Sequence, residues 1–318
     1  MACAYAAVSD EGEHGVGMDQ GNDWAPVPST RGNWSVVGIF AILATAACIG
    51  VAGTRPWEHR KASRLSARIV DLAQLPSLAI TNGTSAADLH PEGVLTWLRG
   101  QDFNKATEKA LLEHPMVKAA EAGTMPLEAV RLVLLEEYSI EKSDLRSMAA
   151  ALARFGDQDA SRNFFLSSAD GENVALKDLV AMAKVLGMSK ADLDVYQPMP
   201  EAHAYSAYLA QLSNYGGAAA IAAGFAVNFP AWGRMCGRIR DALVKPPYSL
   251  SRSDVEFLTY FADPIPGYDE SATAVIAEGM ANGETPASIR SSVKLLQGYE
   301  KMFWDTVWKK AKSGTNSH

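Results

Sequence analysis

The pattern of apolar and polar positions divides the chain into one long apolar run and a series of helical repeats. Residues Gly32 to Thr54 include no charged residue, and about 20 such residues are enough to cross a hydrocarbon core of roughly 30 Å. Trp34 and Trp57 flank the run at a helical separation of about 34 Å, which suits the two membrane interfaces. We therefore predict a single transmembrane helix over residues 34–54, with a buried core helix as the alternative.

Charges on the two sides of this run predict its orientation. Residues 1–33 form an acidic tail with five acidic residues and one basic residue, whereas residues 55–68 hold five basic residues and one acidic residue. The positive-inside rule then translocates the N-terminus and leaves the rest on the cytoplasmic, matrix or stromal side of a bacterial inner, thylakoid or mitochondrial inner membrane. Ala46, Gly50 and Thr54 recur at four-residue steps, which favours packing against a helix of a membrane-protein partner. The alternative is that small residues are simply common in membrane helices.

From about residue 94 onward, apolar residues recur at steps of three and four, and no strand-length alternation occurs. This predicts an all-α fold in which a juxtamembrane helix and linker (55–104) precede a multi-helical bundle (105–312) and a polar tail (313–318). Thr124 is the expected cap of the first long helix, and Ser251 with Asp254 resembles a capping box. The expected helices cover residues 126–155, 157–168, 171–187, 200–214, 217–244, 251–262, 268–282 and 286–311.

Composition narrows the function. The net charge of −7 argues against nucleic-acid binding as the main task. The three cysteines are widely spaced, and no histidine of the expected helices has an acid three residues before it on the same helix, as the Glu-x-x-His pairs of di-iron bundles require. The sequence also lacks a phosphate-binding glycine loop and a GxSxG motif. We therefore predict no metal site and no cofactor.

Two acidic positions stand out. Glu300 interrupts an apolar seam between Leu296 and Phe303, so its carboxylate either has a structural partner or lines a pocket. Glu137 begins an acidic strip that continues with Glu141 and Asp144, and this strip is either a solvated face or part of a site.

An aromatic segment follows near residue 230. Phe229 and Trp232 flank Pro230, which is expected to kink or start a helix. Such aromatic side chains either stack on a planar ligand or belong to the core.

Five segments together resemble the TenA/thiaminase II family, which has a haem-oxygenase-like helical fold. The resemblance covers roughly residues 105–310. In order, the segments are EHPMVKAAEAGTMPLEAVRLVLLEEYS, MPEAHAYSAYLAQLS, FAVNFPAWGRMCGRI, FLTYFADP and YEKMFWDTVWK. The resemblance implies that Glu137 holds an aminopyrimidine ring, that Tyr260 lines the pocket, and that Glu300 is the acid/base near the scissile bond.

Two positions depart from the family pattern. Pro230 stands where the family has its nucleophilic cysteine, and Arg234 stands at an aromatic pocket position. Thiaminase chemistry needs an activated nucleophile. We therefore expect a non-catalytic accessory subunit or ligand-binding module of a membrane complex. The alternative is a hydrolase of an aminopyrimidine or thiamin-like heterocycle with Glu300 as general acid/base.

Overall fold

The structure is a computed structural model that describes residues 89–315. The described residues form helices and no strands, so the all-α prediction is confirmed for this part of the chain. In order, the helices are α2 (Pro91–Arg99), α3 (Asp102–Leu112), α4 (Pro115–Glu121), α5 (Leu127–Phe155), α6 (Asp159–Val185), α7 (Lys190–Val195), α8 (Pro200–Tyr215), α9 (Ala218–Leu243), η4 (Arg252–Val255), α10 (Glu256–Ala262), α11 (Tyr268–Ala281) and α12 (Pro286–Thr315).

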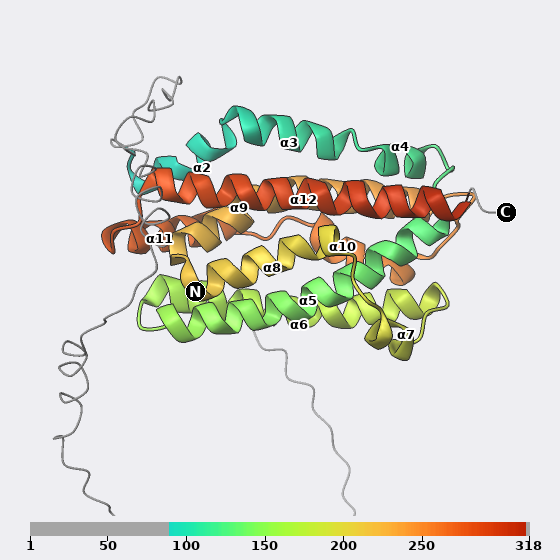
Figure 1. The fold of residues 1–318 in the computed structure, drawn as a ribbon, viewed down its shortest axis with the longest axis horizontal. Helices are drawn as coiled ribbons and strands as arrows, with labels where there is room; N and C mark the ends of the chain where they lie inside the picture. Colours follow the sequence, from blue (N-terminus) through green and yellow to red (C-terminus); the bar gives the residue numbers. More distant parts are fainter. Residues whose placement is uncertain (1–88, 316–318) are drawn as a thin grey trace, which may run out of the picture. The chain divides into compact units, whose positions relative to one another are not determined.

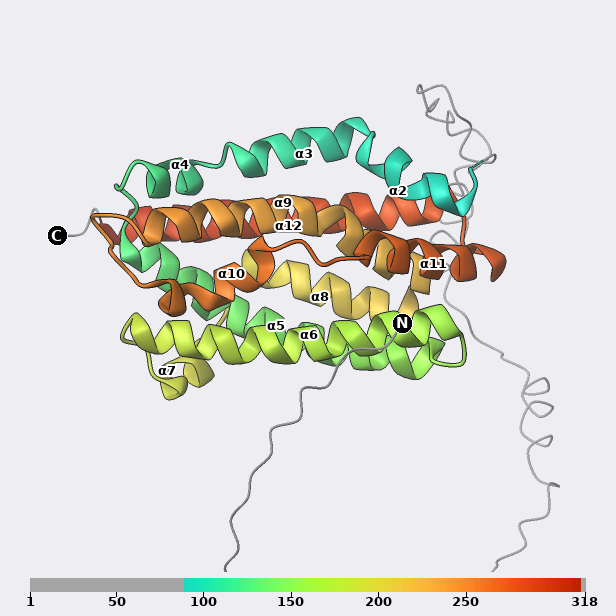
Figure 2. The ribbon, with the colours of Figure 1, turned by 180° about the vertical axis from the view of Figure 1, so that it is seen from behind.

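Helices α9 and α12 run through the middle of the bundle (Figure 1). Helices α3 and α4 lie on one side of this pair, and α5 with α6 lie on the other, as the reverse view also shows (Figure 2). Helix α8 packs against both α5 and α12, and α10 packs against α9 and α6. The interior is therefore bounded by helices that are far apart in the sequence.

The predicted apolar seam of α12 is confirmed as core. Its five members are at most 1% exposed: Ile289, Val293, Leu296, Phe303 and Val307. Complete burial of a large apolar side chain stabilises a fold by roughly 1.5–3 kcal/mol. The seam thus anchors α12 in the bundle and holds Glu300, which interrupts it, inside as well.

Most helix boundaries agree with the sequence pattern, and two expectations were wrong. Helix α6 is continuous through Gly171, where two separate helices were expected. Thr124 does not cap α5, because its hydroxyl donates to the carbonyl of Ala119. Helix α2 lies in the region predicted as a juxtamembrane helix and linker (55–104), and it packs against α9 and α11. The predicted capping box of Ser251 and Asp254 is present.

Pro230 lies inside α9 and does not start it. A proline has no N–H, so the carbonyl four residues earlier loses its helical hydrogen bond. That carbonyl belongs to Ala226, and Nη2 of Arg99 in α2 donates to it at 2.6 Å. The same guanidinium makes two hydrogen bonds to Asp269 of α11, at 2.5 and 2.8 Å. The proline in α9 thus has its compensation in a side chain from another helix.

No helix in the part of the chain between residues 89 and 315 is both long and apolar enough to cross a membrane. The predicted span over 34–54, its Ala46, Gly50 and Thr54 face, and the acidic tail lie outside the described residues.

Candidate ligand-binding site

A small cavity lies between the central helices α9 and α12 and the helices α5, α6, α8 and α10. Its volume is about 30 Å³, which is room for one or two water molecules. We call it the acidic cavity. Its lining comprises Glu137, Ile140, Glu141, Asp144, Glu172, Tyr205, Phe225, Asn228, Phe229, Trp232, Phe261, Glu300 and Phe303.

Five carboxylates line the acidic cavity, and none of its lining residues is basic. Glu137, Glu141 and Asp144 come from α5 and are 3–5% exposed, so the acidic strip is not a solvated face. Burial, together with the neighbouring carboxylates, raises the pKa of each of the three well above its usual value. At neutral pH the cavity therefore holds protons as well as negative charge.

Glu141 and Glu172 form an acid pair between α5 and α6. Burial raises the pKa of both side chains, and their mutual hydrogen bond raises that of Glu141 while it lowers that of Glu172. Burial favours the protonated form of both side chains, and their mutual hydrogen bond favours the proton on Glu141 over Glu172.

Glu300 reaches the cavity from α12. Its Oε1 accepts a hydrogen bond from Nε1 of Trp304 at 2.7 Å, one helical turn further on. Burial raises the pKa of Glu300 to about 7, although the Trp304 indole and the Asn228 amide each lower it. A carboxyl group with a pKa near neutrality is suited to give or take a proton.

Asp144 leaves one acceptor without a partner. Its Oδ1 is buried and has no hydrogen bond, although the side chain lines the acidic cavity. Buried polar atoms are normally paired, so an orphaned acceptor at a cavity wall points to a donor supplied from outside the chain.

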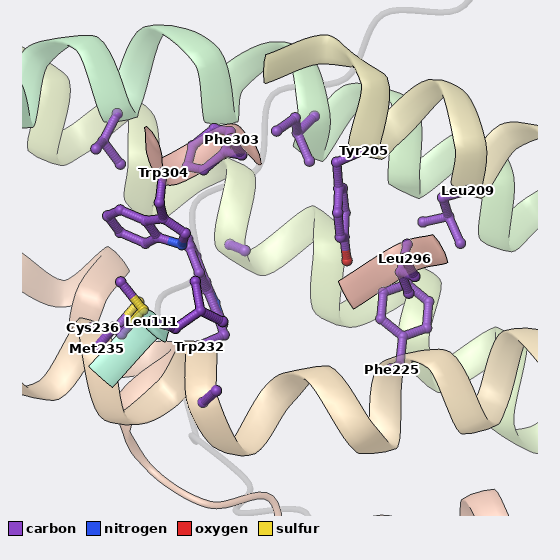
Figure 3. Close-up of a cluster of buried hydrophobic side chains, with 14 of the residues drawn as sticks. Leu111, Tyr205, Leu209, Phe225, Trp232, Met235, Cys236, Leu296, Phe303 and Trp304 are labelled. Atoms are coloured by element: carbon purple, nitrogen blue, oxygen red, sulfur yellow. The ribbon is translucent and has the colours of Figure 1, made fainter. Parts of the chain in front are cut away.

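Aromatic rings close the other walls. Trp232 lies 5.5 Å from Trp304 and 5.4 Å from Phe261 between ring centroids, and Phe229 lies 5.2 Å from Phe225. Tyr205 and Phe225 occupy one end of this buried cluster in Figure 3, and Cys236 lies near Leu111 at the other. Of the predicted residues, Glu137, Glu300, Phe229 and Trp232 thus line one cavity.

Tyr260 is placed elsewhere. It does not line the acidic cavity but two larger pockets beside it, of about 690 and 630 Å³. A Cβ on Gly171 would lie 2.8 Å from its hydroxyl oxygen, so this glycine in α6 makes room for the tyrosine. Phe229 and Phe261 line all three cavities and form the wall between them.

The positions that depart from the family pattern lie outside the acidic cavity. Pro230 and Arg234 line the pocket of about 630 Å³, and Arg234 forms an ion pair with Glu108 of α3. Cys236 is buried, and burial with the nearby Glu137 and Glu300 raises its thiol pKa well above the usual value. A thiol in this environment stays protonated and is a poor nucleophile.

Glu172 lines the cavity but was not among the site residues predicted from the sequence. It lies in α6, one of the predicted helical regions, where its spacing resembles that of any polar helix position. Only the packing of α6 against α5 brings it to Glu141. The sequence marked this position only through Gly171, the residue before Glu172, because a glycine inside a helix often has a packing or functional reason.

The five carboxylates do not make a metal centre by their arrangement. Among residues 89–315, no group of three or more His, Cys, Asp or Glu side chains is placed to hold a metal ion. The donors that the cavity offers are therefore hydrogen-bond partners and negative charge, which suit an N–H group or an organic cation.

Comparisons with known proteins identify the family and the fold of this bundle. The model of the TENA/THI-4/PQQC family matches residues 104–310, more than half of the chain. A TenA homologue from P. horikoshii OT3 superposes with a TM-score of 0.56 at 18% identity, covering 68% of this chain and 98% of that one. A TenA homolog from Pseudomonas syringae pv. tomato str. DC3000 gives 0.57 at 17% identity, with 72% and 98% covered.

A third solved structure is a domain of unknown function with a heme oxygenase-like fold from Shewanella denitrificans OS217. It has a TM-score of 0.57 at 16% identity and covers 70% of this chain and 96% of that one. The comparison with curated proteins found no match. At these identities, the similarity to solved structures establishes the fold.

Proposed function

Because the chain belongs to the TENA/THI-4/PQQC family, we propose that it is a membrane-anchored binding module for a small nitrogen heterocycle of the aminopyrimidine type. The acidic cavity binds the N–H-bearing edge of the ring, and the module is a non-catalytic accessory subunit of a membrane complex. The observation that carries the proposal is the cavity itself, in which five carboxylates, four of them buried, face aromatic walls without a basic residue.

The chemistry of the lining supports binding without covalent catalysis. An amino group or ring N–H can donate to the free Oδ1 of Asp144 and to the carboxylates of Glu137 and Glu300. Phe229 and Trp232 present faces on which a flat ring can stack. The lining includes no cysteine, serine, threonine or lysine, which are the usual covalent nucleophiles.

We infer that access is from the neighbouring pocket of about 690 Å³, because Glu172, Phe229 and Phe261 line both cavities. A volume of about 30 Å³ is smaller than a heterocycle, so the polar edge enters only when the wall formed by Phe229 and Phe261 shifts. We therefore expect binding to be accompanied by rotation of these two rings.

Binding of 4-amino-2-methylpyrimidine to the full chain in mild detergent tests the proposal. We expect calorimetry to show saturable binding that 2,4-dimethylpyrimidine, which lacks the amino group, does not reproduce. Glu137→Gln and Glu300→Gln should each weaken binding about tenfold, because each replaces an acceptor oxygen with an amide N–H, and a buried donor left unpaired costs roughly 1–3 kcal/mol. The matched control is Glu128→Gln, on the half-exposed first turn of α5. Equal binding of the two pyrimidines, or loss in the control alone, contradicts the proposal.

A hydrolase is the second candidate, and the pKa of Glu300 near 7 favours it. In this case the Glu300 carboxylate takes a proton from the attacking water. It returns that proton to the amine that leaves an aminopyrimidine, whereas the thiazolium of thiamin leaves as a neutral thiazole and the proton goes to solvent, so no cysteine is needed. Hydrolysis of thiamin or of an aminopyrimidine by the wild-type chain, measured as product release, would identify the hydrolase if Glu300→Gln abolishes it. Binding without turnover would identify the module.

The membrane anchor rests on residues 32–54 and their flanking charges, which lie outside the described residues. We expect the full chain to remain in the membrane fraction after a carbonate wash and to co-purify with other membrane proteins in mild detergent. Release by the wash would contradict the anchor, and isolation as a free monomer would contradict the accessory role.

A further inference from the structure

The larger pocket, of about 690 Å³, is a second candidate site. It lies between α6, α9, α10, the segment Pro264–Gly267 and α11, and its volume is typical of sites for small organic ligands. Six aromatic residues line it: Phe164, Phe225, Phe229, Tyr260, Phe261 and Tyr268. Several of these rings touch, with Phe164 and Phe229 at 5.5 and 5.3 Å from Tyr268.

One carboxyl group faces this aromatic enclosure. Glu172 is the only acidic residue of the pocket lining, and the lining holds no lysine, arginine or histidine. Its carboxylate is held by the hydrogen bond with Glu141 on the cavity side. Glu172 is partly exposed because it also faces the pocket, where an incoming group can reach it.

We propose that this pocket binds an organic ammonium ion of low molecular weight, with the cationic nitrogen at Glu172 and the hydrocarbon part against Tyr260, Phe261 and Tyr268. Aromatic faces attract cations through their quadrupole, and a carboxylate at the base of the enclosure adds direct charge complementarity. The site goes beyond the proposed function, since it takes a ligand of another class in the larger pocket, which shares Glu172, Phe229 and Phe261 with the acidic cavity.

The lining disfavours other classes of ligand. An anion meets Glu172 and no basic group, so its binding is unfavourable. A bare divalent metal ion finds one carboxylate where it needs several oxygen ligands. A neutral aromatic molecule can use the apolar walls but leaves Glu172 without a counter-charge. The ammonium class is the one that satisfies both the rings and the carboxylate.

Glycine at position 171 gives the pocket part of its space. It precedes Glu172 in α6, and a side chain there would displace the Tyr260 hydroxyl, which lies 2.8 Å from the added Cβ. Gly171 thus lets the tyrosine ring lie close to the helix that carries the carboxylate.

Titration of the full chain in mild detergent with benzylammonium and with its neutral isostere benzyl alcohol tests the inference. We expect calorimetry to show at least about tenfold tighter binding of benzylammonium, in keeping with desolvated cation–π attraction. Glu172→Gln should remove most of this preference. Asp170→Asn, an exposed acid two positions earlier on the same helix, should retain it.

The outcomes separate this inference from the proposed function. Glu300→Gln should leave benzylammonium binding unchanged, because Glu300 does not line the larger pocket. Equal affinity of the two probes for the wild-type chain overturns the inference without reference to any variant. Undiminished preference in Glu172→Gln also overturns it, and neither result bears on aminopyrimidine binding.

Discussion

At the scale of single residues, Pro230 and Arg99 have to be considered together. The proline removes a hydrogen bond from the interior of α9, and Arg99 supplies a donor to the carbonyl of Ala226 that is left over. A buried carbonyl without a partner costs roughly 1–3 kcal/mol. The two residues are 131 positions apart in the sequence, and Arg99 supplies the hydrogen bond that Pro230 removes.

A double-mutant cycle measures this dependence. Arg99→Met should lower the free energy of unfolding by about 1–3 kcal/mol, because the Ala226 carbonyl loses its donor. In the Pro230→Ala background the cost should be smaller, because the introduced alanine restores the helical N–H. Urea denaturation of the four chains gives the coupling energy.

Asp269→Asn is the control for this cycle. It weakens the ion pair of Arg99 but leaves the bond to Ala226 in place, so it should not couple to Pro230→Ala. A coupling energy of zero between Arg99→Met and Pro230→Ala would mean that the Ala226 carbonyl does not depend on the arginine.

At the scale of helices, three N-termini are capped by glutamates from elsewhere in the chain. Glu278 of α11 accepts hydrogen bonds from the backbone of Ala160 and Ser161 in α6, at 2.8 and 2.9 Å. Glu284 does the same for Ala219 and Ala220 in α9. The third is Glu136 of α5, which accepts a hydrogen bond from the backbone N–H of Met199 at the start of α8. The negative carboxylate also suits the positive end of each helix.

Glu278→Ala should lower the free energy of unfolding by about 1–2 kcal/mol, the usual cost of a lost cap. Glu278→Gln keeps an acceptor oxygen but loses the charge, so its cost should be smaller. Chemical denaturation of both variants distinguishes a cap from a general packing effect. Equal costs for the two substitutions would argue against capping.

The sequence predicted which segments form helices because apolar periodicity is local. It did not predict these caps, since Glu278 and Ala160 lie 118 positions apart. The same limit applies to the acidic strip: spacing placed Glu137, Glu141 and Asp144 on one face of a helix. Whether that face met solvent or the cavity was decided by how α5 packs with α6, α8 and α12.

At the scale of the whole molecule, the acidic cavity makes stability depend on pH. The pKa of Glu300 rises from an ordinary 4.5 to about 7 on folding, so the folded chain binds a proton that the unfolded chain has lost. Glu300 makes its full contribution to the free energy of unfolding below pH 4.5, and this contribution is lost as the pH rises through 7. The total change is about 3 kcal/mol, at 1.36 kcal/mol per pKa unit.

Urea denaturation between pH 4.5 and 8.5 measures this contribution. Relative to Glu300→Gln, the wild-type chain should lose stability as the pH rises, with the largest loss between pH 5 and 8. Glu128→Gln, on the half-exposed start of α5, should follow the wild-type profile. A wild-type chain that gains stability with pH relative to Glu300→Gln would show that Glu300 is ionised in the fold.

The fold around the candidate site was predicted better than the site itself. The seam of α12 placed Glu300 inside, and the aromatic segment placed Phe229 and Trp232 beside it. Tyr260, assigned to the same site by resemblance, lies in neighbouring pockets. Glu172 enters the site only through contacts between helices, which a single sequence does not encode locally.

The wall formed by Phe229 and Phe261 is common to three cavities. A ring that turned to enlarge one of them would take volume from another. If the two proposed ligands bind, each is then expected to change the affinity of the other by the same factor, as reciprocity of a coupling free energy requires. Rotation of two rings would be enough for this coupling.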